Sequence, residues 1–143
     1  MNGFAMQSAA FPATNKPCLL VHGGAWDIPD EACAAYRDGL EAAVECGRAR
    51  LEAGASAVET AAEVVAVMEE HGAFDAGRGA MLNRDGVVEL DAGIMDGATL
   101  RYGAVIGTRR LAQPVRVAYR LLVESDGQAR ILTREGAERF AAD

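Results

Sequence analysis

The sequence predicts an α+β fold in which helices pack against an antiparallel sheet. Two stretches with the helical spacing of apolar residues come first, over about residues 30–53 and 57–71. From Ala80 the spacing changes to the alternation typical of strands, with short turns between them. A doubly wound parallel sheet would instead alternate single strands with helices. The order of elements therefore favours helical layers over a strand meander.

The N-terminal part is expected to contain one strand. Cys18–Val21 is a short apolar run that ends at His22-Gly23-Gly24, a pattern typical of a buried strand meeting a tight loop. Before it, residues 1–17 lack the basic start and continuous apolar core of a signal peptide, so we expect a flexible lead-in. The folded domain is then expected to span residues 18–143.

The first helix is expected between Asp30, a suitable N-cap, and Gly54, a suitable stop signal. Its apolar residues recur at the spacing of one helix face. The residues expected to point inward are Leu40, Ala43, Val44, Gly47 and Leu51.

The second helix begins with a capping box, because Ser56 and Glu59 stand three positions apart before an apolar run. It is expected to end near His71-Gly72. The residues expected to point inward are Val58, Ala61, Ala62, Val65 and Met68.

A hairpin is expected next, with Ala80–Asn83 and Val87–Met95 joined by the turn Arg84-Asp85-Gly86. Asp96-Gly97 begins a second turn, and Arg101–Thr108 supplies a further strand. This meander is the expected sheet.

The C-terminal part is expected to add a helix, a short strand and a last helix. Pro114 suits the first turn of a helix through about Glu124. After a turn at Ser125-Asp126-Gly127, Arg130–Leu132 is expected to form the strand, and Thr133 to cap the last helix.

Charge and composition disfavour several classes of function. The 143 residues are 50% hydrophobic, with a net charge of −7 and a pI near 4.8. No Lys/Arg block is present, which disfavours nucleic acid and an anionic membrane as partners. No apolar run approaches the ~20 residues of a membrane span. Cys18, Cys33 and Cys46 are an odd number without metal-like spacing, which fits reduced thiols in a cytoplasm, and two histidines exclude a His-rich metal site.

Gly77-Arg78-Gly79 invites a phosphate-loop interpretation that its context does not favour. The segment lacks the third glycine of a dinucleotide fingerprint and the Gly-Lys-Ser/Thr of a phosphate loop. It also precedes a strand, whereas both motifs open a helix. The simpler interpretation is a loop whose glycines permit positive φ angles.

Asp91 and Asp96 invite an interpretation as a catalytic carboxylate pair. They are five positions apart, so on one strand their side chains point to opposite faces and cannot flank one bond. Glu89 and Asp91 do share a face, but exposed acidic residues on an antiparallel strand are ordinary. Asp96, before Gly97, most simply caps N–H groups of a turn.

His22 leaves two interpretations open. A lone histidine just past a buried strand is usually a core residue hydrogen-bonded to the backbone. The two glycines after it would also suit an oxyanion-binding loop, because residues without Cβ let a backbone N–H approach a ligand closely. No complete catalytic set accompanies it: Ser56 is used in capping, the cysteines have no neighbouring base, and the remaining candidates lack a distinguishing context. These are Thr99, Thr108 and Thr133.

Several segments together resemble the N-terminal part of the isoaspartyl peptidase/L-asparaginase family, the plant-type asparaginases among the N-terminal-nucleophile hydrolases. Each segment alone is weak, but their order and spacing are specific over nearly the whole chain. The spacing of HGGA to the first helix looks more like this family than like its glycosylasparaginase and threonine-aspartase relatives. The segments are LLVHGGAWDIP (Leu19–Pro29), LEAGASAVETA (Leu51–Ala61), FDAGRGAMLNRDGVVELDAGIMDG (Phe74–Gly97), GAVIG (Gly103–Gly107), QPVRVAYRLL (Gln113–Leu122) and EGAERFA (Glu135–Ala141).

The resemblance implies a precursor that cuts itself just before a threonine. That threonine begins a separate β subunit and acts as nucleophile, with its own α-amino group, of pKa roughly 8, as the base. The usual opening of the β subunit, Thr-Val-Gly-Ala-Val, has no counterpart here. The chain then resembles an α subunit that forms half of a four-layer αββα sandwich, in an (αβ)2 dimer of heterodimers. The catalytic nucleophile would not lie on this chain, and no organic cofactor is implied.

The resemblance also implies a structural sodium ion held by the loop from Met68 to Gly79. Main-chain carbonyls would wrap the cation, so that side-chain identity matters little. His22, Gly23 and Gly24 match a mobile glycine loop that positions the nucleophile for self-cleavage. The carbonyls that match the sodium ligands belong to Met68, Glu69, His71, Phe74, Ala76 and Arg78.

Two residues depart from the family pattern. Asp75 stands where asparagine is common, at the position nearest the nucleophile, and a carboxylate there would raise the pKa of the threonine amine. Gln113 replaces an asparagine before Pro114, which we expect to alter only a helix cap.

The function implied is hydrolysis of the side-chain amide of L-asparagine and of β-aspartyl (isoaspartyl) dipeptides in the cytoplasm. One alternative is a non-catalytic binding module that acts without a β partner. Such a lone chain would leave the apolar sheet over Val87–Thr108 uncovered. Another is a relative specialised for glycosylasparagine or for protein cleavage, which only residues of the β subunit would decide.

Overall fold

The computed structural model describes residues 16–143, so the expected lead-in lies almost entirely outside the described residues. The elements are an α+β set, as expected. Within the described part, no helix combines the length and apolarity required to cross a membrane. In chain order the elements are a 3₁₀ turn η1 (Asp30–Ala32), α1 (Cys33–Glu52), α2 (Ala57–His71), a 3₁₀ turn η2 (Gly77–Gly79), β1 (Leu90–Asp96), β2 (Arg101–Thr108), α3 (Pro114–Glu124), β3 (Ile131–Thr133) and α4 (Arg134–Ala142).

The sheet has the order β1-β2-β3, and it is mixed rather than antiparallel. β1 and β2 form an antiparallel pair across the second turn of the expected meander, with Gly93 opposite Ala104. β3 runs parallel to β2, with Val105 opposite Leu132, so the expectation of a wholly antiparallel sheet is wrong. The reason is α3, which carries the chain back across the sheet between β2 and β3, as a parallel connection requires.

The expected strand at Ala80–Asn83 is absent, and β1 begins at Leu90 instead of Val87. The turn itself is present, with the Asn83 N–H donating to the Val87 carbonyl at 2.9 Å. The Asn83 side-chain oxygen also accepts from the N–H groups of Asp85 and Val87. A side chain that takes backbone N–H groups in this way competes with a strand ladder.

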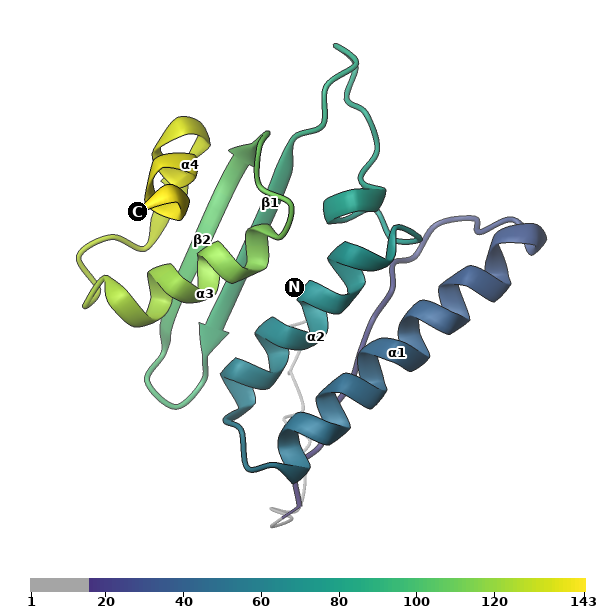
Figure 1. Ribbon diagram of the computed structural model, residues 1–143, viewed down its shortest axis with the longest axis horizontal. Helices are drawn as coiled ribbons and strands as arrows, with labels where there is room; N and C mark the ends of the chain where they lie inside the picture. The colour runs from purple at the N-terminus through teal and green to yellow at the C-terminus, as the bar shows by residue number, and fades with distance from the viewer. Residues whose placement is uncertain (1–15) are drawn as a thin grey trace, which may run out of the picture.

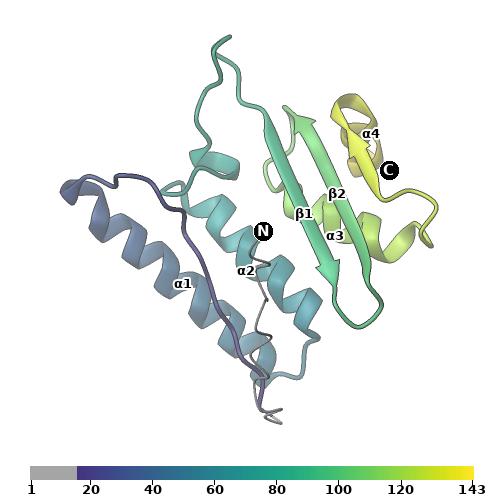
Figure 2. The ribbon, with the colours of Figure 1, turned by 180° about the vertical axis from the view of Figure 1, so that it is seen from behind.

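The expected strand at Cys18–Val21 is not formed either. This segment runs extended across α1 and α2, on the same side of the helices as the strands (Figures 1 and 2). Leu19 and Val21 pack against the helix pair, whereas Leu20 is 86% exposed. A strand needs a hydrogen-bonded neighbour, and the described residues supply none for this segment.

The first helix differs from expectation at its start. Asp30 opens the turn η1 rather than capping α1, and the N-cap position of α1 is Ala32, which makes no side-chain cap hydrogen bond. At the other end Gly54 adopts the expected left-handed conformation, with φ of 84°. Ala43 and Gly47 are buried as expected, but Val44 is 45% exposed.

The second helix begins as expected, because the Ser56 hydroxyl accepts the Glu59 N–H at 3.2 Å. The Glu59 carboxylate pairs with Arg50 instead of completing the capping box. Ala61 and Val65, expected to point inward, are exposed. The reason is that α2 lies between α1 and α3 and is covered on two sides (Figure 1). Its buried residues are Thr60, Ala62, Val64, Ala66, Met68 and Glu69.

Pro114 begins α3, as expected, but the expectation for Gln113 is wrong in part. Its side chain makes no cap hydrogen bond; it donates to the Ala66 carbonyl at 3.3 Å and accepts from Arg116, linking α3 to α2. Thr133 precedes α4 as expected but makes no side-chain cap. The strand before it is shifted by one residue from Arg130–Leu132 to Ile131–Thr133.

Helix α3 covers one face of the sheet. Ile94 of β1 packs with Ala118 and Leu122 of α3. Among residues 16–143, no helix lies over the opposite face of β1 and β2 (Figure 2). The strand residues exposed among the large hydrophobics are Met95, Tyr102, Ile106 and Ile131.

Gly103 sets the distance between α3 and β2. A Cβ atom built there would collide with the Ala118 carbonyl and would lie 2.8 Å from the Leu122 nitrogen, both of which are backbone. We therefore expect Gly103→Ala to lower the free energy of unfolding by about 2–3 kcal/mol, the size of an overpacking defect. Urea denaturation of the full-length protein measures it, with Gly97→Ala as the matched control because nothing lies within 4 Å of a Cβ there. Equal stability of the two variants would contradict this packing.

Candidate functional site

The loop after α2 curls back so that main-chain carbonyls face its own glycines. Gly72 ends α2 in the left-handed conformation, with φ of 80°. A Cβ on Gly77 would lie 2.6 Å from the Glu69 carbonyl oxygen. One on Gly79 would collide with the Phe74 carbonyl oxygen and lie 2.6 Å from that of Gly72. We call residues 68–79 the carbonyl loop.

The residues of the carbonyl loop fit a monovalent cation. Among residues 16–143, no three or more His, Cys, Asp or Glu side chains form a group that could hold a metal ion. The ligands expected from the resemblance are main-chain carbonyls, and oxygen ligands suit a hard cation. The Phe74 and Ala76 carbonyls each accept one N–H, at 2.8 and 3.1 Å, and a carbonyl has a second lone pair. The full ligand set expected from the sequence stays a prediction.

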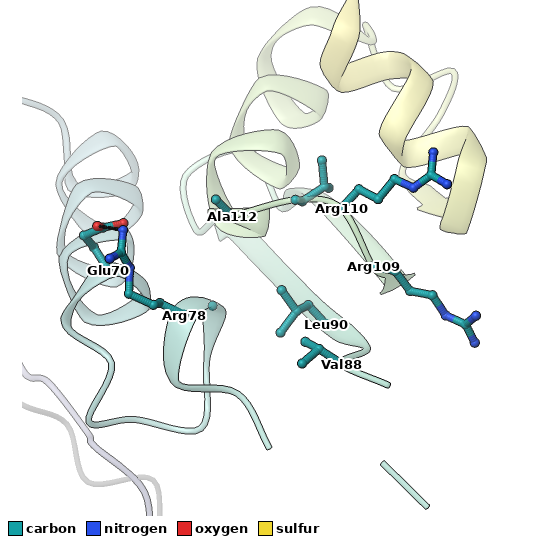
Figure 3. Close-up of a pocket in the computed structure, with 9 residues that line it drawn as sticks. Glu70, Arg78, Val88, Leu90, Arg109, Arg110 and Ala112 are labelled. Carbon is teal, nitrogen blue, oxygen red and sulfur yellow. Dashed lines mark ion pairs between the residues drawn. The ribbon is translucent and has the colours of Figure 1, made fainter. Parts of the chain in front are cut away.

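Gly77-Arg78-Gly79 forms the turn η2, which opens no α-helix. Arg78 pairs with Glu70, and beside them lies a cavity of about 360 Å³ that reaches Val88 and Leu90 (Figure 3). The guanidinium groups of Arg109 and Arg110 extend away from this cavity (Figure 3). The arginines therefore do not converge on a phosphate, in agreement with the loop-forming interpretation.

The segment His22–Trp26, which we call the glycine loop, lies at the surface. His22 is exposed, so its interpretation as a core residue is wrong. Its Nδ1 accepts the Gly24 N–H at 3.2 Å, so the expected bond to backbone is present. The imidazole is exposed because the extended segment before it is not covered by a sheet.

A cleft of about 540 Å³ brings the glycine loop and the carbonyl loop together. Gly24 and Trp26 line one side, and Asp75 and Gly79 line the other. Asp75 is exposed, and its Oδ1 accepts the Met81 N–H at 2.8 Å. The structure thus gathers residues of the two segments that the resemblance singled out, although they are some fifty positions apart in the sequence.

The resemblance singles out Glu69 only for its carbonyl, but its side chain also has a role in the structure. Its side chain is 2% exposed, and Oε1 accepts the Val115 N–H at 3.1 Å in the first turn of α3. Oε2 has no hydrogen-bond partner among the described residues. Burial raises the pKa of the Glu69 carboxyl to about 7, against the lowering effects of the Val115 N–H and Arg116. The signal was an acidic residue at the helical spacing of Ala62 and Ala66.

The acidic residues of the strands have structural roles. Asp91 accepts the Gly107 N–H at 2.7 Å across the hairpin. Asp96 accepts the Ala98 N–H and the Thr99 hydroxyl, as expected for a turn residue, and these bonds lower the pKa of its carboxyl. Glu89 pairs with Arg109 at 2.6 Å. None of these carboxylates lines the cleft beside Asp75.

The arrangement of the two loops agrees with comparisons to known proteins. A family model described as Asparaginase matches residues 15–143. The chain belongs to the asparaginase family. The isoaspartyl peptidase/L-asparaginase of Danio rerio is 47% identical over 125 residues, which are 87% of this chain. The isoaspartyl peptidase of Escherichia coli K12 is 42% identical over 131 residues, or 88% of this chain.

This asparaginase-family chain spans about 40% of the length of each of those two relatives. The isoaspartyl peptidase/L-asparaginase of Xenopus laevis gives the same share, with 43% identity over 126 residues. The resemblance seen in the sequence is therefore confirmed at the level of the family.

The buried carboxyl of Glu69 predicts a pH-dependent stability. The folded protein keeps this proton up to about pH 7, whereas the unfolded chain loses it near 4.5. Ionisation of Glu69 therefore destabilises the folded protein. This destabilisation is absent below pH 4.5, grows as the pH rises from 4.5 to about 7 and is complete above pH 7. The difference corresponds to about 3 kcal/mol.

We expect Glu69→Gln to remove this pH dependence, because the amide oxygen still accepts the Val115 N–H but carries no charge. Urea unfolding of the full-length protein between pH 4.5 and 8, in sodium- and potassium-free buffer, measures the difference. Glu70→Gln is the matched control, since the neighbouring Glu70 is exposed. Parallel stability curves for the parent protein and Glu69→Gln would contradict the assignment.

Proposed function

We propose that this chain is the α portion of an autoprocessed amidohydrolase. The substrates proposed are the side-chain amide of L-asparagine and the β-aspartyl bond of isoaspartyl dipeptides. The names of the relatives from Danio rerio and Xenopus laevis support this substrate class. The observation that carries the proposal is a sheet with an exposed apolar face and an unpaired outer strand, in a chain whose two loops meet at the cleft that contains Asp75.

Two features of this chain support a further polypeptide that packs against it. Met95, Tyr102 and Ile106 leave an apolar face uncovered, which would favour aggregation of a lone chain. The extended segment at Cys18–Val21 and the outer edge of β1 also lack strand partners among the described residues. Both lie on the same side of the helices (Figure 2). A β portion would supply the missing strands, and the proposed assembly is an (αβ)2 dimer of heterodimers within an αββα sandwich.

The proposed nucleophile is a threonine that begins the β portion. Its hydroxyl attacks the amide carbonyl while its own amine takes the proton, and that proton passes to the nitrogen that leaves as the C–N bond breaks, which is ammonia from L-asparagine or an amine from the dipeptide. Water then hydrolyses the threonyl ester and restores the hydroxyl. In this scheme His22, Gly23, Gly24 and Asp75 surround the nucleophile and do not react.

We also propose that the carbonyl loop holds a sodium ion. The inward carbonyls of Glu69 and Phe74 support this assignment. The ion would supply a fixed positive charge that keeps the loop closed, and the proposed ligands are the carbonyls of Met68, Glu69, His71, Phe74, Ala76 and Arg78. A cytoplasmic location is proposed because all three cysteines are free thiols.

The first test is intact mass and N-terminal sequencing of every polypeptide that co-purifies with the full-length protein. We expect a second polypeptide that begins with threonine, together with hydrolysis of L-asparagine. Purification of a single uncut species without activity would refute the proposal and favour the non-catalytic binding module.

The position of Asp75 leads to a second prediction, which concerns the pH dependence of hydrolysis. Its carboxylate would raise the pKa of the threonine amine, which must be neutral to act as a base. A unit charge about 4 Å away in water contributes about 1 kcal/mol, or roughly 0.7 pH units. We expect Asp75→Asn to move the acidic limb of the kcat/KM profile for L-asparagine to lower pH by that amount. Stability should be kept, because the asparagine oxygen still accepts the Met81 N–H.

The matched control is Asp85→Asn, which removes the same charge from an exposed turn that does not line the cleft. Superimposable pH profiles for the parent protein and Asp75→Asn would rule out an electrostatic effect of Asp75 on the nucleophile.

A further inference from the structure

Phe74 is a residue of the carbonyl loop whose side chain contacts the glycine loop. Its carbonyl is one of those that face inward in the carbonyl loop, where it lies against Gly79. Its ring is 3% exposed and lies on the other side of the backbone, against the glycine loop and α1. One residue therefore has its backbone at the proposed cation site and its side chain behind the glycine loop.

The Phe74 ring occupies a slot between two glycines, and any other residue at either position would place a Cβ atom too close to the ring. A Cβ on Gly23 of the glycine loop would lie 2.9 Å from the Phe74 Cε1 atom. A Cβ on Gly39 of α1 would lie 2.6 Å from Cε2 and 2.8 Å from Cζ. Such distances are below any normal carbon contact, so the ring packs directly on the backbone of Gly23 and of Gly39, and a Cβ at either position would force the ring to shift.

A second contact joins the same ring to the far end of the glycine loop. Phe74 meets Tyr36 edge-on, with ring centroids 5.3 Å apart and an interplanar angle of 80°. The Tyr36 hydroxyl accepts the Trp26 Nε1–H at 2.9 Å. The glycine loop is thus in contact with Phe74 directly at Gly23 and through Tyr36 at Trp26.

We propose that Phe74 is a positioning residue that couples the carbonyl loop to the glycine loop. A monovalent cation on the carbonyls would hold the Phe74 backbone, and the ring would then select one arrangement of His22-Gly23-Gly24. Because packed contacts of this kind have discrete arrangements, the coupling acts as a shift between states and works in both directions. The inference rests on the proposed cation site and adds the route by which the cation acts on the cleft.

Trp26 provides the measurement, because it is the single tryptophan of this chain. The full-length protein is labelled with 5-fluorotryptophan, and the resonance of Trp26 is assigned by its loss in Trp26→Phe. Sodium chloride is titrated at constant ionic strength against choline chloride, while ²³Na relaxation reports binding of the ion directly. We expect the Trp26 resonance to move and to saturate at the sodium concentration at which ²³Na binding saturates.

Two variants disturb the slot from different sides. Phe74→Leu shortens the side chain, and Gly39→Ala pushes on the ring from α1, where the new Cβ would also lie 2.9 Å from the His71 Nδ1 atom. In both we expect less than half of the parent displacement of the Trp26 resonance at saturating sodium. Gly136→Ala is the matched control, because it is also a helical glycine and nothing lies within 4 Å of a Cβ there. It should keep the full displacement.

Several outcomes would overturn the coupling. These are saturable ²³Na binding with a silent Trp26 in the parent protein, a full displacement in either folded slot variant, and no saturable sodium binding at all. Hydrolysis of L-asparagine by the same preparations is read separately. Loss of the coupling in a hydrolysing enzyme rejects this inference alone, whereas intact coupling without hydrolysis rejects the proposed function alone.

Discussion

The burial of α2 on two sides is the constraint on which the rest of this structure depends. Val64 and Met68 belong to the cluster shared with α1, and Ala62 belongs to the cluster shared with α3 and β1. Because α2 contributes residues to both clusters, a movement of α2 would disrupt both of them. Its last turn forms the start of the carbonyl loop, so the packing of α2 sets the position of that loop.

Glu69 joins this constraint to the site. Its side chain is buried against the first turn of α3, while its carbonyl faces Gly77 in the carbonyl loop. A carboxyl held away from water with one unpaired oxygen is destabilising when ionised. We interpret the buried Glu69 carboxyl as a loss of stability that accompanies the arrangement of backbone oxygens in the carbonyl loop. The aromatic contacts of Phe74 then connect the carbonyl loop to the glycine loop.

The exposed apolar face of the sheet and the extended segment without a strand partner have the same origin. Met95, Tyr102 and Ile106 alternate along β1 and β2 with the residues that pack on α3, as one face of a two-sided sheet must. The extended segment at Cys18–Val21 has the composition of a buried strand but has no strand beside it among the described residues. The proposed β portion would account for each of these features.

Local signals in the sequence determined the hairpin of β2 with β1, the Ser56 cap, the start of α3 at Pro114 and the stop at Gly54. Each depends on residues a few positions apart, whose conformational preferences act before any tertiary contact. The resemblance also identified the two loops of the cleft. Tertiary structure decided the parallel pairing of β3, the two-sided burial of α2, the exposure of His22 and the role of the Glu69 side chain. These depend on contacts between distant segments, and a periodic pattern states which residues are apolar without stating which neighbour covers them.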